Sequence, residues 1–330
     1  MKATRMKALI LAACACLLLP FAAQSSAAVT IKFAHMNSPK DKVHRAAEMI
    51  KAGVEERTAG AVKIQLFPSG QLGENKDVLE QARLGSGLMG QFGVGHLGEY
   101  VPNFSLFLHP FLFNSWDEAK KLLASDLIKG WEKQLEDDFG IIVLGYGNFG
   151  VRDFYTLSKP IRTPADTRGM GIRVQPVKMY TEMIAAIGAS AQTLPWMEVY
   201  SALSQKVIDG AEAPPSSMLD QKHNEIVKYM SITEHMLDVV PFATSAKVFN
   251  SLSAEQQQIL REETIKALEW MSAEVVRSND ELINQIEASG VTIIRDVDKD
   301  AFREATKNIS KAFPEWTPGI YDQARKIIAK

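Results

Sequence analysis

The stretch Gly93–Gly98 reads GVGHLG and fits the G-x-G-x-x-G pattern, in which glycines let the backbone approach a dinucleotide pyrophosphate. Such a site joins a strand to a helix whose N-terminus holds the pyrophosphate. A strand pattern precedes these glycines, but Pro102 and Pro110 interrupt the segment that follows, and it has no apolar helical stripe. Asp117, at the right distance for a ribose contact, falls in a helix-capping pattern. We therefore expect a glycine-rich turn where backbone segments pack closely, and no dinucleotide cofactor.

Two arginines lie at or near strand patterns, Arg152 in GNFGVRDFY and Arg173 in GMGIRVQP. A partly buried arginine on a strand needs an anion. The anion is either an internal Asp or Glu, in a structural ion pair, or a ligand carboxylate, which a planar guanidinium binds through two parallel hydrogen bonds. The residues alone leave both interpretations open.

Other catalytic patterns are missing from the sequence. It contains no G-x-S-x-G, no H-E-x-x-H and no P-loop. Its six histidines have no metal-ligand spacing, although His35 ends a strand pattern and is a candidate to face a cleft. We expect neither a metal nor an enzyme, with an exported α/β enzyme kept as the less favoured alternative.

The N-terminus has the features of a secretory signal peptide over residues 1–28. A basic segment, MKATRMK, precedes the apolar run ALILAACACLLLPFAA and then small residues, which predict cleavage after Ala28 or Ala27. A membrane anchor is less favoured because the run is short and contains Pro20. LAAC, ending at Cys14, resembles a lipoprotein processing site, but the apolar run continues well beyond it.

Export determines the cysteine content and charge of the mature chain. Both cysteines, Cys14 and Cys16, lie in the signal, so no disulfide or thiol nucleophile remains. Removing Lys2, Arg5 and Lys7 from the 37 basic residues leaves 34 against 39 acidic residues, a net charge of −5. Such a chain is a poor candidate for binding nucleic acid.

The full sequence has 46% hydrophobic and 23% charged residues, and its mature part alternates strand and helix patterns. Strands are predicted at 29–35, 61–67, 88–95, 141–147, 171–175, 189–195, 209–213 and 291–297. Helices are predicted from a Ser38–Pro39 cap to Gly60 and over 74–85, 116–140 (with a break permitted at Gly130), 177–188, 196–208 and 253–290. This order predicts an α/β protein, and the length favours two domains. Ligands of such folds lie beyond the carboxyl ends of strands.

Several blocks, in order, give the mature chain a resemblance to the DctP-type solute-binding proteins of tripartite ATP-independent periplasmic (TRAP) transporters. They are LFPSGQLGENKDVLEQARLGS, HPFLF, GVRDFYTLSKPIRTPADTRGMGIRVQ, PWMEVYSALSQKVIDGAEAPPS and FNSLSAEQQQIL. The resemblance implies a periplasmic two-domain clamshell that closes on a small organic acid and delivers it to a TRAP membrane permease. The implied domains are 29–149 with about 239–277, and 150–238 with about 278–330, and the long helix after Ser253 runs along both.

The resemblance also implies site residues. Arg173 is the family's carboxylate clamp, Arg152 adds a second contact, and Trp196 is an aromatic wall or plain core packing. Glu74 is a polar contact from the N-terminal domain or a carboxylate favoured at a helix N-terminus.

The pattern departs from many members at DGAEAP, where Ala213 replaces an asparagine that often contacts ligand. Glu212 is kept, as a structural residue or a hydroxyl acceptor. Gln175 and the GAEAPPS block resemble members that bind sugar acids, so a hexuronate-like acid is preferred. A dicarboxylate or another monocarboxylate is the alternative.

Overall fold

The structure, a computed structural model, describes residues 28–330. Residues 1–27 of the predicted signal peptide, which include Cys14, lie outside the described residues. Ala28 is the first described residue, and cleavage after Ala28 or Ala27 stays a prediction. Between Ala28 and Lys330, no helix is both long and apolar enough to cross a membrane.

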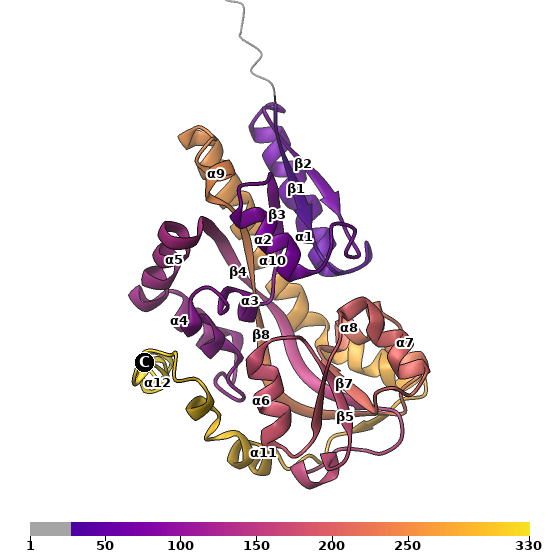
Figure 1. Cartoon of the computed structure of the whole chain (residues 1–330). Coiled ribbons are helices and arrows are strands. Elements are labelled where there is room, and N and C mark those ends of the chain that lie inside the picture. The colour runs from indigo at the N-terminus through magenta and orange to yellow at the C-terminus, as the bar shows by residue number, and fades with distance from the viewer. Residues whose placement is uncertain (1–27) are drawn as a thin grey trace, which may run out of the picture.

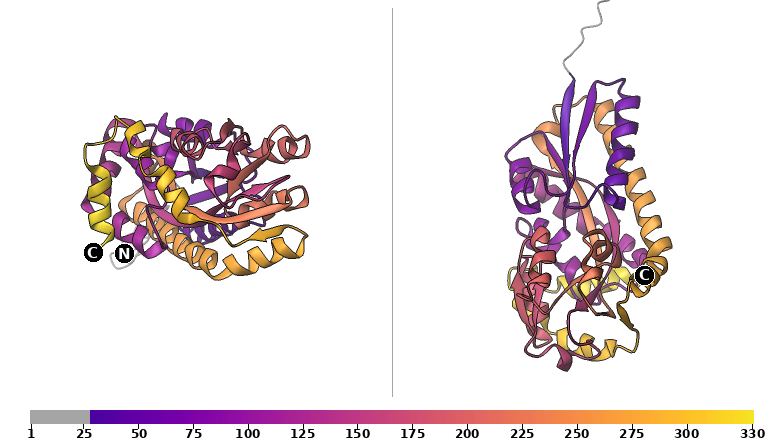
Figure 2. Two further views of the ribbon diagram at one scale, coloured as in Figure 1. Left: turned by 90° about the horizontal axis from the view of Figure 1, so that it is seen from below. Right: turned by 90° about the vertical axis from the view of Figure 1, so that its right-hand side faces the viewer.

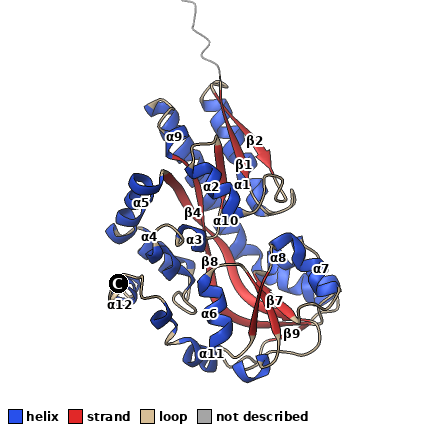
Figure 3. Cartoon of the chain, viewed as in Figure 1, coloured by secondary structure: helices blue, strands red, loops and turns tan. Residues whose placement is uncertain are grey.

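The described chain alternates strands and helices, as expected for an α/β fold (Figure 3). The strands are β1 (Val29–Ala34), β2 (Val62–Phe67), β3 (Leu88–Gln91), β4 (Ile141–Thr156), β5 (Gly171–Val174), β6 (Ser190–Thr193), β7 (Gly210–Ala213), β8 (Tyr229–Ser245) and β9 (Thr292–Ile294). The helices are α1 (Lys42–Arg57), α2 (Asn75–Arg83), α3 (Val94–Leu97), α4 (Trp116–Leu123), α5 (Asp126–Phe139), α6 (Lys178–Ala186), α7 (Val199–Ser204), α8 (Pro215–Asp220), α9 (Ala246–Phe249), α10 (Ala254–Ala288), α11 (Lys299–Thr306) and α12 (Ile320–Ile328).

One sheet runs through the molecule in the order β2-β1-β3-β8-β4-β7-β5-β6, with β9 beside β8. Its two ends are parallel groups, β2-β1-β3 and β7-β5-β6. The long antiparallel strands β4 and β8 join them (Figure 1). We call β1–β3 with α1 and α2 the first lobe, and β5–β7 with α6–α8 the second lobe. The carboxyl ends of both parallel groups meet between the lobes.

The central strands β4 and β8 differ from the strands predicted from the sequence, and their pairing is irregular. The predicted strand at 141–147 continues to Thr156, and β8 was not predicted. Their pairing shifts register at three places, the first between Val143 and Gly145. A Cβ at Gly145 would lie 2.9 Å from Leu268 Cδ1, so the missing side chain lets α10 pack directly on the sheet.

The helix α10 confirms the expected long helix along both lobes (Figure 2). Ser253 and Gln256 form the predicted capping box at its start. The helix packs on α1 in the first lobe, crosses β4, and packs on α8 in the second lobe. It therefore ties both lobes to the central strands.

Two predicted helix features differ from the structure. The side chain of Asp41, not Ser38, accepts the capping hydrogen bond of α1, from the Val43 amide at 2.8 Å. The break in 116–140 falls between α4 and α5, where the Ser125 hydroxyl donates to the Leu122 carbonyl, and not at Gly130.

Three buried clusters form the core. One lies between β1, β2, α1 and α10, and one between β7, α7 and α8. The third extends from α2 through α4 and α5 to α6, α11 and α12. The C-terminal helix α12 packs on α4, within the residues predicted for the first domain. The predicted domain boundaries stay a prediction.

Candidate functional site

A cavity of about 360 Å³ lies between the two lobes. Residues that follow β1, β3 and β5 line it, together with the middles of β4 and β8. Its walls include Met36, Asn37, Glu74, Asn75, Lys76, Asp77, Gln91, Gly93, His96, Phe149, Arg152, Arg173, Gln175, Pro176, Thr193, Leu194, Pro195, Trp196, Ala213, Ser217, Asp238 and Val240. This is the expected ligand position, beyond the carboxyl ends of parallel strands.

Arg173, on β5, is 1% exposed and lines the cavity. Its Nε and Nη2 donate to the Leu194 carbonyl at 3.0 and 2.7 Å, and its guanidinium lies 5.1 Å from the Trp196 ring. Its Nη1 has no hydrogen-bond partner, and among residues 28–330 no carboxylate forms an ion pair with it. Burial lowers the pKa of Arg173 to about 10. A buried cation without a counterion is costly, so this side chain is suited to an external anion.

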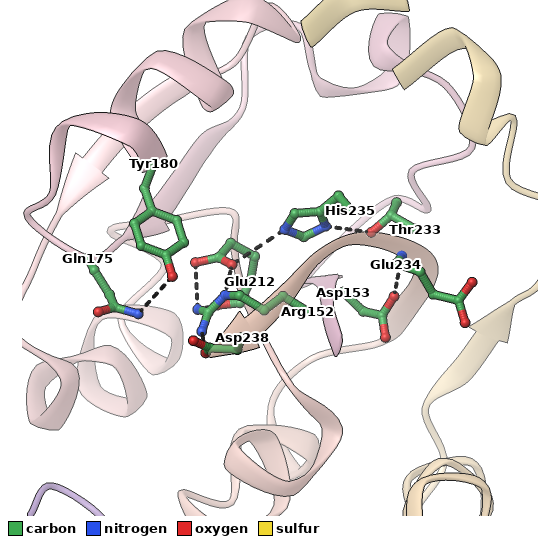
Figure 4. Close-up of polar contacts among 9 residues, drawn as sticks. All are labelled: Arg152, Asp153, Gln175, Tyr180, Glu212, Thr233, Glu234, His235 and Asp238. Carbon is green, nitrogen blue, oxygen red and sulfur yellow. Dashed lines mark hydrogen bonds and ion pairs between the residues drawn. The ribbon is translucent and has the colours of Figure 1, made fainter. Parts of the chain in front are cut away.

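Arg152, on β4, has a different environment (Figure 4). Its Nε and Nη2 donate to the Glu212 carboxylate and its Nη1 donates to Asp238. Nη2 also donates to the Glu212 carbonyl at 2.8 Å. Arg152 still lines the cavity, but its counterions are internal, as in the structural interpretation of the sequence.

The surroundings of this ion-pair cluster are buried. His235 Nε2 lies 3.5 Å from Glu212, and its ring stacks on Phe154 with 4.5 Å between centroids. Burial lowers the pKa of His235. Burial also raises the pKa of Asp238, although Arg152 beside it opposes the shift.

Three other predicted site residues line the cavity: Glu74, Gln175 and Trp196. Glu74 precedes α2 but makes no side-chain capping bond. Burial raises its pKa, and the charge of Arg173 opposes the shift. Gln175 donates to the Tyr180 hydroxyl at 3.3 Å (Figure 4). The site therefore combines the clamp candidate Arg173 with polar groups from both lobes.

Two predicted site residues do not line the cavity. His35 is buried in the first lobe, where its Nε2 lies 3.0 Å from His44 Nδ1. Glu212 is fully buried and contributes through Arg152. A ligand contact by either residue stays a prediction without support from the described geometry.

Several polar residues that line the cavity were not predicted from the sequence: Asn37, Gln91, His96, Thr193, Ser217 and Asp238. Gln91 lies just before the glycine segment and His96 lies within it. The glycine pattern could therefore have indicated these two lining residues. Asp238 lies on β8, which was not recognised as a strand.

The glycine segment itself is a site of close packing. A Cβ at Gly95 would lie 2.7 Å from both Leu108 Cδ1 and Val177 Cγ1, and Gly93 lines the cavity opposite Gln175. The helix that begins inside the segment, α3, has only four residues. Residues 28–330 also contain no group of three metal-ligating side chains.

Known proteins of one family are similar to this chain over most of its length. Residues 33–315 match the family described as bacterial extracellular solute-binding protein, family 7, or DctP. The 2,3-diketo-L-gulonate-binding periplasmic protein YiaO of Escherichia coli strain K12 is 30% identical over 288 residues, which cover 87% of this chain and 88% of that protein.

Solved structures show the same fold. A TRAP periplasmic solute-binding protein of Ochrobacterium anthropi with bound L-fuconate has a TM-score of 0.88 and 32% identity, covering 92% of this chain and 100% of that one. One from Fusobacterium nucleatum with bound sn-glycerol-3-phosphate has a TM-score of 0.88 and 33% identity, covering 92% and 97%. These relatives are solute-binding transport proteins rather than enzymes. The chain belongs to the DctP family of bacterial extracellular solute-binding proteins.

Proposed function

We propose that this protein captures a sugar acid, such as a hexuronate or an aldonate, in the periplasm and delivers it to a TRAP membrane permease. The observation that carries the proposal is the buried, unpaired guanidinium of Arg173 in a cavity between two lobes. A ligand carboxylate would supply the missing anion. Ligand hydroxyls would meet the polar side chains of the other walls, including Glu74 and Gln175. Relatives that bind 2,3-diketo-L-gulonate and L-fuconate support the sugar-acid class.

The test is a titration of the purified mature protein with a small panel of solutes. We expect saturable binding of galacturonate, glucuronate, galactonate or gluconate by calorimetry, and a raised melting midpoint, because such ligands bind only the folded state. Galactose, which lacks the carboxylate, should not bind. Preferred binding of sn-glycerol-3-phosphate or succinate would contradict the sugar-acid assignment. Unchanged solute by nuclear magnetic resonance after prolonged incubation would exclude an enzyme acting on these acids.

Export and delivery are further parts of the proposal. We expect the mature protein to begin at Val29 or Ala28, which the intact mass of periplasmic material measures. A diacylglyceryl mass on Cys14 would contradict it. Uptake into proteoliposomes that hold the permease should need both the binding protein and an ion gradient. Uptake that instead required ATP would contradict delivery to a TRAP permease.

A further inference from the structure

The two arginines in the cavity wall, Arg173 and Arg152, differ in the number of carboxylates that pair with them. Arg173 contributes a cation whose Nη1 has no hydrogen-bond partner and which forms no ion pair with a carboxylate of residues 28–330. Arg152 is paired with two carboxylates at once, Glu212 and Asp238. Since one guanidinium cancels one carboxylate, the Arg152 cluster has a surplus of one negative charge.

The donors of Arg152 are already used. Nε, Nη1 and Nη2 each donate to Glu212 or Asp238, so the guanidinium has little capacity left for a ligand anion. His235, which approaches Glu212, does not cancel the surplus, because burial disfavours its charged form. Burial also raises the pKa of Asp238, but the Arg152 guanidinium to which it is bound opposes this shift. The Tyr180 ring, 5.1 Å from the Arg152 guanidinium, is neutral at ordinary pH.

The surplus charge reaches the cavity through Asp238. Asp238 lines the cavity and is 3% exposed, whereas Glu212 lies behind the wall. Ala213, in the same wall, has a methyl side chain and so offers no side-chain donor to an anion. A carboxylate accepts hydrogen bonds from ligand hydroxyls, but a second ligand carboxylate facing Asp238 would be repelled.

We propose that Asp238 is a specificity-determining residue, which makes the cavity accept a polyhydroxy acid with one carboxylate and reject the corresponding diacid. This inference rests on the proposed function, because it assumes that Arg173 holds the first carboxylate. In this proposal the cavity distinguishes the two acids by repelling the diacid, not by attracting the monoacid more strongly.

Matched acid pairs test the inference. Galactarate differs from galactonate, and glucarate from gluconate, only in a second carboxylate at C6. Like charges brought together at an interface weaken binding. The protein should therefore bind galactonate or gluconate about a hundredfold more tightly than its diacid by calorimetry at pH 8. Equal affinities for acid and diacid would overturn the proposal.

Variants identify the residue responsible. Asp238→Asn keeps the shape and leaves the neutral Arg152–Glu212 pair, so the preference for the monoacid should shrink at least about tenfold. Glu212→Gln removes the same surplus from behind the wall and should shrink it too, which covers the case in which Asp238→Asn fails to fold. Asp153→Asn is the control, since Asp153 is buried beside Arg152 on β4 but does not line the cavity. The Asp153→Asn variant should prefer the monoacid over the diacid by the same factor as the parent.

The outcomes separate this inference from the proposed function. If the parent binds neither galactonate nor gluconate nor any other acid of the panel, the proposed function fails. If the parent prefers the monoacid but neither Asp238→Asn nor Glu212→Gln reduces the preference, the proposed function stands and the role of Asp238 is wrong.

Discussion

Without a ligand, the buried position of the Arg173 side chain does not stabilise the folded protein. A buried guanidinium normally has a carboxylate partner, whereas the contacts of this one within the described part of the chain are the Leu194 carbonyl and the Trp196 ring. Binding residues are often kept at such a cost to stability. The missing carboxylate partner is the feature that distinguishes an arginine that binds a ligand from one in a structural ion pair.

Arg173→Ala should therefore abolish tight binding without harming the fold. Leaving one member of a buried ion pair without its partner costs about 3–5 kcal/mol, so affinity for the best acid should fall on the order of a hundredfold or more. Arg173→Lys should also bind poorly, because an ammonium group cannot reproduce the planar fork. Calorimetry measures the affinity, and the melting midpoint without ligand should stay equal or rise. A variant that binds as tightly as the parent, or that unfolds, would refute the clamp.

Asp153 predicts a pH effect on stability that is separate from binding. Burial raises its pKa to about 7 from the ordinary 3.8, although the Glu234 amide donates to it at 2.8 Å. Between these values the folded protein holds a proton that the unfolded chain releases, so stability falls as pH rises towards 7. Asp153→Asn removes this loss. The difference in melting midpoint, variant minus parent, should increase as the pH rises from about 4 to 7 and stay constant above that. A constant offset would contradict the assignment.

The elements show which features the sequence could predict. The long helix α10 was predictable because its capping pair and its length are local signals. The strand β8 was not, because Glu234, His235 and Asp238 interrupt its apolar pattern. Arg152 and Glu212, which pair with Asp238 and His235, come from the other strands β4 and β7. The register shifts of β4 are likewise set by β8. Arg173 was singled out by its strand pattern, and the family blocks then implied its role and that of Trp196. The ion-pair partners of Arg152 could not be predicted, because they are brought to it by the pairing of β4 with β7 and β8.

The glycine segment gives a test at the level of elements. Gly95→Ala places a Cβ 2.7 Å from Leu108 and Val177, so one of these side chains or the backbone has to move. Overpacking of this kind costs about 1–3 kcal/mol. Gly130→Ala is the matched control, because nothing lies within 4 Å of its Cβ and alanine favours the α5 helix by about 1 kcal/mol. Chemical denaturation should show Gly95→Ala destabilised and Gly130→Ala stabilised. The opposite order would mean that the segment packs loosely.

At the scale of the whole molecule, the two lobes touch at places outside the cavity. The Ser38 amide, after β1, donates to Asp220 Oδ2 at 3.0 Å, and the Ser38 hydroxyl donates to Asp220 Oδ1. Asp220 ends α8 in the second lobe. A binding protein that closes around its solute gains affinity from any contact made only in the closed state, since that contact shifts the population towards closure.

Asp220→Ala should therefore favour the open state and weaken binding, although Asp220 does not line the cavity. A hydrogen bond to a charged group contributes about 1.5–3 kcal/mol, and Asp220 is only half-buried, so we expect a loss of affinity of roughly tenfold. Solution scattering should show a larger radius of gyration for the variant than for the parent at the same subsaturating solute concentration. Ser38→Ala should have a smaller effect because the amide donor remains, and the double variant should resemble Asp220→Ala alone, since the two residues share one contact. Additive losses would show that Asp220 acts through something other than Ser38, and unchanged affinity and scattering would show that this contact does not favour closure.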